Sequence, residues 1–166
     1  MLPPFVRKYL LMALSGTPDV LDGLLKGIPD EDPLWDFRPD PERFTLREVV
    51  AHLADWEPIF LERMVRIQKE TASSLLSYDE GQFALDRDYA HQSPQANLRR
   101  FREGRPRMVA FLRSLEASEW LREGRFVTNE AEPGEPISME GWLAQVAGHD
   151  GYHMQQTAQW LAEGRR

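Results

Sequence analysis

A helix start and a helical repeat follow each other in Thr45-Leu46-Arg47-Glu48-Val49-Val50-Ala51-His52-Leu53-Ala54-Asp55-Trp56. Thr45 and Glu48 form a capping box, in which a threonine caps the helix and a glutamate lies three residues further on. Apolar residues then recur every three or four positions, the period of one face of an α-helix. These positions are Leu46, Val49, Val50, Leu53, Trp56, Phe60, Met64 and Ile67. The pattern predicts an amphipathic helix over 46–70, bent at Pro58.

Two later segments, about 94–115 and 139–163, show the same period. Ser93 and Ser138 precede them and suit the cap position. Arg105 is a charged exception on the apolar face of the first of these helices.

The N-terminal segment, about 5–27, is also helical in pattern but is interrupted at Gly16-Thr17-Pro18. It is either one kinked helix or a short arm followed by a helix that begins near Thr17, because proline suits the first helical turn.

The connections differ in composition. Proline is dense over 28–44, which excludes a long helix there. The segment 71–92 is polar with some local helix, and 121–137 is expected to be a loop with a short extended piece at 125–128. Four amphipathic helices with a long first connection predict an all-α four-helix bundle, and 166 residues suit a single domain over 1–166.

Three of the four histidines lie where helix geometry directs them to one point. His149 and His153 are four residues apart and share a helix face, and His52 borders the apolar stripe of helix 46–70. Two imidazoles so spaced can chelate one divalent metal, and a third from a facing helix leaves positions open, as in catalytic sites. The pattern predicts a metal site of His52, His149 and His153; the alternative is a buried polar network.

Several residues near this site have two interpretations each. Asp150 follows His149 where the H-E-x-x-H motif of metalloproteases has glutamate, so that motif is a poor match. Candidate partners for the histidine N–H groups, each also consistent with a solvated surface residue, are Asp55, Glu57, Asp150 and Gln156. Arg105 has two interpretations. The favoured one is that it pairs with an internal carboxylate or reaches the surface; the other is that it holds a substrate carboxylate. His91 is interpreted as an exposed loop residue.

Composition excludes several function classes. The net charge of -7 argues against nucleic-acid and anionic-membrane partners. No cysteine is present, which excludes disulfides, thiolate ligands and an internal thiol nucleophile. The N-terminus lacks the charge order of a signal peptide and no run is long enough to span a membrane, so a cytoplasmic location is expected.

The chain resembles the DinB-like, or YfiT-like, superfamily of metal-dependent enzymes over nearly its whole length. The resemblance is carried by Leu46-Arg47-Glu48-Val49-Val50-Ala51-His52-Leu53-Ala54-Asp55-Trp56-Glu57 and by Gly148-His149-Asp150-Gly151-Tyr152-His153-Met154-Gln155-Gln156. The entry to the first of these, Trp35-Asp36-Phe37-Arg38-Pro39, is similar too.

This resemblance implies an up-down-down-up bundle with a metal, nickel or zinc, between the helices. It places the family's histidine triad on His52, His149 and His153, with no departure at any of the three. It also implies an enzyme that acts on a small-molecule substrate. It leaves the reaction open and identifies no catalytic residue beyond the metal ligands.

The activity expected first is transfer of an external low-molecular-weight thiol, of the bacillithiol or mycothiol type, to an electrophilic small molecule. The metal would present this thiol as a thiolate. The alternatives are a metal-dependent hydrolase with water as nucleophile and Glu57 or Asp150 as base, and a non-enzymatic stress-response bundle.

A homodimer is expected, mainly from the resemblance. The sequence adds five tryptophans, and Trp120 lies near a loop rather than on a core stripe. Because aromatic residues are enriched at interface cores, Trp120 or Trp35 is a candidate contact; the alternative is that both cap the ends of the bundle.

Overall fold

The computed structural model describes residues 2–71, 73–128 and 134–166. Four long helices dominate it: α1 (Pro4–Leu25), α2 (Leu46–Lys69), α4 (Pro94–Ser114) and α5 (Met139–Gly164). A short helix, α3 (Glu80–Asp86), and 3-10 turns at Pro33–Asp36, Tyr89–His91 and Glu119–Leu121 lie in the connections. The four predicted helices are therefore confirmed, each within two residues at its ends.

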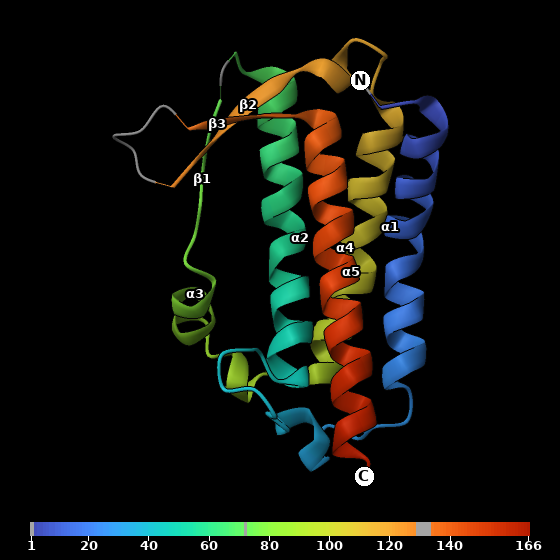
Figure 1. The fold of residues 1–166 in the computed structure, drawn as a ribbon, viewed down its shortest axis with the longest axis vertical. Coiled ribbons are helices and arrows are strands. Elements are labelled where there is room, and N and C mark those ends of the chain that lie inside the picture. Colours follow the sequence, from blue (N-terminus) through green and yellow to red (C-terminus); the bar gives the residue numbers. More distant parts are fainter. Residues whose placement is uncertain (1, 72, 129–133) are drawn as a thin grey trace.

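The four long helices form a bundle in which α1 and α5 run one way while α2 and α4 run the other (Figure 1). Each helix packs against two neighbours: α2 lies against α4 and α5, and α1 lies against the same two. The order along the chain is up-down-down-up, as expected. It brings α2 and α5 side by side and antiparallel, and these are the helices that carry the three histidines.

The predicted helix starts are observed as hydrogen bonds. The Thr45 hydroxyl accepts from the backbone N–H of Glu48, and a Glu48 carboxylate oxygen accepts from the Thr45 N–H at 2.8 Å. Ser93 and Ser138 cap α4 and α5 in the same way. These caps satisfy N–H groups that have no partner within the helix.

The N-terminal helix is continuous through Pro18, so the first of the two alternatives is correct and there is no separate arm. Proline has no N–H, which leaves the carbonyl of Leu14, four residues earlier, without its usual donor. Arg105 Nη1 donates to that carbonyl at 3.0 Å. A side chain from α4 thus replaces the backbone hydrogen bond that Pro18 cannot donate within α1.

A small sheet, which the sequence did not indicate, lies across one end of the bundle (Figure 1). It consists of β1 (Ser74–Leu76), β2 (Glu123–Val127) and β3 (Glu135–Ser138) in the order β1-β2-β3. β1 pairs with β2 in parallel, and β2 pairs with β3 antiparallel. The expected loop over 121–137 is therefore wrong apart from its extended piece, although 129–133 lie outside the described residues. The fold is mostly helical rather than purely helical.

Both tryptophans considered for a dimer contact are buried within the chain. Trp35 is fully buried and donates from its indole N–H to the carbonyl of Pro29 at 2.7 Å. Trp120 packs in the core with its ring under the guanidinium of Arg7. The burial of both rings is explained by contacts within the chain and gives no support to a dimer contact. The homodimer itself stays a prediction.

The core extends along the bundle in two large clusters of apolar side chains, one toward each end. Within the described ranges, no helix combines the length and the apolar character needed to cross a membrane.

Candidate metal centre

The structure brings His52, His149 and His153 together inside the bundle. One ring nitrogen from each lies within 4.8 Å of the others, and the Nε2 atoms of His52 and His149 are 2.8 Å apart. His52 is fully buried and His153 is 3% exposed, whereas the side chain of His149 keeps 13% exposure. The three histidines are thus largely buried, and His149 is the most exposed of them.

Burial keeps His52 and His153 neutral. Together with the neighbouring His149, it lowers the pKa of His153 to about 3. Burial also lowers the pKa of His52, and the other two imidazoles act in the same direction. A neutral imidazole has a free lone pair, which is the form that binds a metal.

The orientation of His153 is set by Gln156, one turn further along α5. The amide N–H of Gln156 donates to the carbonyl of Phe44 at 2.6 Å, which leaves its oxygen to face His153 Nδ1 at 3.3 Å. When Nδ1 carries the proton, Nε2 keeps the lone pair for a ligand. Of the candidate N–H partners, Gln156 therefore acts as expected.

Aromatic side chains surround the three imidazoles. Ring centroids of Phe44 and Trp56 lie 5.2 and 5.3 Å from that of His52, and Phe60 lies 5.2 Å from His149. The carbonyl of Phe44 is fixed by the indole N–H of Trp160 as well as by Gln156. These rings limit the access of water, which strengthens electrostatic interactions at the site.

The three-nitrogen set fits a divalent metal. Three imidazole donors from two helices are a known ligand set for catalytic zinc, with a fourth position left to water or substrate. The Nδ1 atoms of His52 and His149 are buried without a hydrogen-bond partner among the described residues, and the Nε2 atoms of the two rings face each other. Metal binding by the three histidines stays a prediction that this geometry supports.

Comparison with family models gives a match to the DinB superfamily over residues 13–157. The chain belongs to the DinB superfamily. A comparison with curated proteins gave no match.

The DinB fold is also seen in a solved structure. YfiT from Bacillus subtilis, described as "a probable metal-dependent hydrolase with an unusual four-helix bundle topology", superposes with a TM-score of 0.87. The two chains share 21% identity, and the match covers 98% of this chain and 90% of that one. At this identity the likeness establishes the bundle and its topology.

In this DinB superfamily member, Arg105 pairs with two internal carboxylates, as favoured from the sequence. Its Nε donates to Glu57 at 2.8 Å and its Nη2 to Asp150 at 3.1 Å, and all three side chains are buried. Burial raises the pKa of Glu57 although Arg105 opposes it. Burial would raise the pKa of Asp150 too, but its hydrogen bonds and the charge of Arg105 lower it overall.

This pairing changes the interpretation of both carboxylates. Asp150 is 4.0 Å from His149 Nδ1, which is too long for a hydrogen bond. Arg105 binds both oxygens of Asp150 but only Oε1 of Glu57. Glu57 Oε2 is buried without a hydrogen-bond partner among the described residues, so the role of either carboxylate as a base stays a prediction.

Asp55, the remaining candidate partner, pairs with Arg87 at 3.2 Å and with Arg100 at 2.5 Å rather than with an imidazole. His91 is exposed and pairs with Asp88, as a loop residue was expected to. A carboxylate that lies on the same helix as a candidate metal-binding histidine therefore need not contact that histidine.

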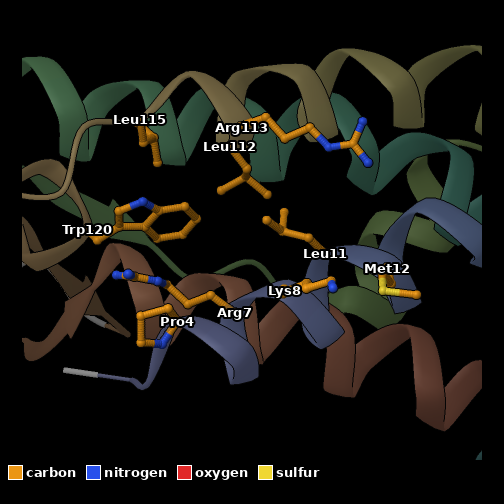
Figure 2. A pocket seen from close by; sticks show the side chains of 9 residues that line it. All are labelled: Pro4, Arg7, Lys8, Leu11, Met12, Leu112, Arg113, Leu115 and Trp120. Carbon is orange, nitrogen blue, oxygen red and sulfur yellow. The ribbon is translucent and has the colours of Figure 1, made fainter.

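A pocket of about 410 Å³ lies between α1 and α4, with the Trp120 ring at one end (Figure 2). Figure 2 shows Arg7 and Leu112 beside that ring and Lys8, Met12 and Arg113 toward the opposite end. No histidine of the triad lines it. The candidate site is thus identified by its chemistry and not by the size of a cavity.

Proposed function

We propose that this protein is a metal-dependent hydrolase whose divalent ion, nickel or zinc, is held by His52, His149 and His153. The observation that carries the proposal is the approach of three ring nitrogens to within 4.8 Å of one another in a largely buried site. A description of YfiT, which has the same fold, as a probable metal-dependent hydrolase adds support.

A bound ion would act as a Lewis acid and lower the pKa of the attacking water. The chain's own residues prepare the site for it. Gln156 fixes the tautomer of His153, and burial keeps His52 and His153 neutral. Phe44, Trp56 and Phe60 restrict water. The substrate would approach from the side of His149, the most exposed of the three rings. We assign no side chain as the general base.

Thiol transfer, the activity expected first from the resemblance, would use the same three ligands. The description of the solved relative supports hydrolysis instead. The two activities differ in the atom that reaches the product, which is oxygen from water in one and sulfur in the other.

We expect turnover of a small-molecule ester or amide by the zinc- or nickel-loaded protein without any added thiol. The experiment screens a panel of chromogenic esters and amides in ¹⁸O-labelled water, with and without a low-molecular-weight thiol. One ¹⁸O atom in the acid product, with loss of turnover in His153→Ala, is the predicted result. His91→Ala is the matched control because His91 is exposed and lies away from the site.

Two results would overturn the proposal. Turnover that needs the thiol and yields a sulfur conjugate would identify a transferase. Turnover that is equal in wild type and His153→Ala would show that the histidine site takes no part.

A further inference from the structure

Arg63 is a buried charge that has no carboxylate partner among the described residues. It lies on α2, is 3% exposed, and donates from Nη2 to the carbonyl of Leu76 at 2.5 Å. Among the described residues it forms no ion pair and no further hydrogen bond. Buried charges are normally paired, as Arg105 is by two carboxylates. Four of the five N–H groups of the Arg63 guanidinium therefore remain free to bind another acceptor.

Four aromatic rings enclose this guanidinium. Its Cζ lies 5.4 Å from the ring centroid of Trp56, 5.2 Å from Tyr78, 5.6 Å from Phe126 and 5.4 Å from Trp142. These rings come from α2, the segment after β1, β2 and α5. The small sheet thus supplies one wall of the enclosure. Cation–π contacts stabilise the charge but provide no hydrogen-bond acceptors.

Two of the four rings carry donors without acceptors. The indole N–H groups of Trp56 and Trp142 are buried and have no partner among the described residues. Buried donors that lack an acceptor are rare in folded proteins and require an explanation. The Arg63 nitrogens that lack a hydrogen-bond partner are not fully buried, so a ligand can reach them from solvent. A ligand that brings acceptor oxygens would satisfy all three side chains.

The guanidinium and the histidine triad both contact the ring of Trp56. Arg63 follows His52 by three helical turns on the same face, and helical side chains lean toward the N-terminus. The Arg63 side chain does so, because it reaches the ring of Trp56 two turns earlier. That ring lies 5.3 Å from His52 and 6.3 Å from His149 between centroids. One aromatic ring therefore separates the charge from the triad.

We propose that Arg63 and the indole N–H groups of Trp56 and Trp142 bind the carboxylate of a small organic acid beside the histidine triad. A carboxylate matches the planar fork of guanidinium and has acceptor sites left for an indole N–H. One buried cation balances one negative charge, which favours a carboxylate over a phosphate dianion. The identification of this acid as the substrate rests on the proposed function, whereas the carboxylate site itself does not.

Binding of butanoate and hexanoate, each compared with its neutral amide, tests the site. Calorimetry and indole fluorescence are measured on metal-free His153→Ala, so that any bound metal cannot account for carboxylate affinity. We expect each carboxylate to bind at least about tenfold more tightly than its amide, because a hydrogen bond to a charged group contributes more than a neutral one.

Further variants in the same background assign the binding to residues. Arg63→Gln should remove the preference for carboxylate, and Trp142→Phe, which keeps the ring and removes one donor, should weaken carboxylate binding about 2–10-fold. Arg66→Gln is the matched control, since Arg66 lies on the same helix but pairs with Glu62 and Glu70 at the surface. Circular dichroism checks that each variant is folded, and Trp142→Phe keeps the test valid should Arg63→Gln unfold.

Equal affinity for carboxylate and amide would overturn the proposal, as would an unchanged preference in both Arg63→Gln and Trp142→Phe. Tighter binding of inorganic phosphate than of either carboxylate would overturn the assigned ligand class. Carboxylate binding that needs the metal-loaded wild type would assign the anion to the metal instead of Arg63. Because the assay uses neither metal nor turnover, a failed hydrolase assay leaves it unaffected.

Discussion

Replacing His153 with alanine is expected to weaken zinc binding by more than about 100-fold, because even residues that only orient a ligand contribute about 10–100-fold to affinity. The chain should stay folded. Its core consists of two large apolar clusters along four long helices, so folding does not depend on the ion as it does in a zinc finger. Calorimetric zinc titration measures the affinity, and circular dichroism measures the helix content.

His91→Ala provides the control for this experiment, since it removes an imidazole that is exposed and distant from the triad. It should bind zinc as the wild type does. An unchanged affinity in His153→Ala would exclude His153 from the ligand set, and loss of helix content would show that the triad is needed for folding.

Replacing Arg105 with methionine is expected to reduce the free energy of unfolding by about 3–5 kcal/mol, the usual cost of leaving a buried charge unpaired. Glu57 and Asp150 would both lose their cation, and the carbonyl of Leu14, freed by Pro18, would lose its donor. Chemical denaturation followed by circular dichroism measures the change.

Arg102→Met is the matched control on the same helix. Arg102 pairs with Asp19 and Asp22 at the surface, and such pairs contribute about 0–1 kcal/mol. Adding Glu57→Gln and Asp150→Asn to Arg105→Met should restore much of the lost stability, because the triple variant leaves no charge in this cluster. A single Arg105→Met variant as stable as Arg102→Met would contradict the structural role of this cluster.

The helices and the convergence of the histidines could be predicted from the sequence because both depend on local spacing. The Thr45 capping box and the Ser93 and Ser138 caps are determined within one helical turn, and they are observed. His149 and His153 must share a helix face, and His52 had to border an inward stripe. The triad then required only that α2 and α5 be neighbours, which the family resemblance implied.

The remaining features depend on contacts between distant segments. The strands are three to five residues long, too short for an alternating pattern to stand out, and β1 pairs with β2 across about fifty residues of chain. The sequence places Trp120 near a loop, whereas its burial depends on distant segments, namely α5 and Arg7 of α1. The sequence does not distinguish Arg63 from the other arginines, since only the folded chain shows that it has no carboxylate partner among the described residues.

The central claim is that three imidazoles hold one metal ion, and X-ray absorption spectroscopy tests it most directly. Protein prepared without a histidine tag is saturated with zinc, freed of excess metal and measured at the zinc edge. The account predicts one ion per chain with three imidazole nitrogens at about 2.0–2.1 Å. A chain that retains no zinc, or a zinc ion whose spectrum lacks imidazole scattering, would contradict it.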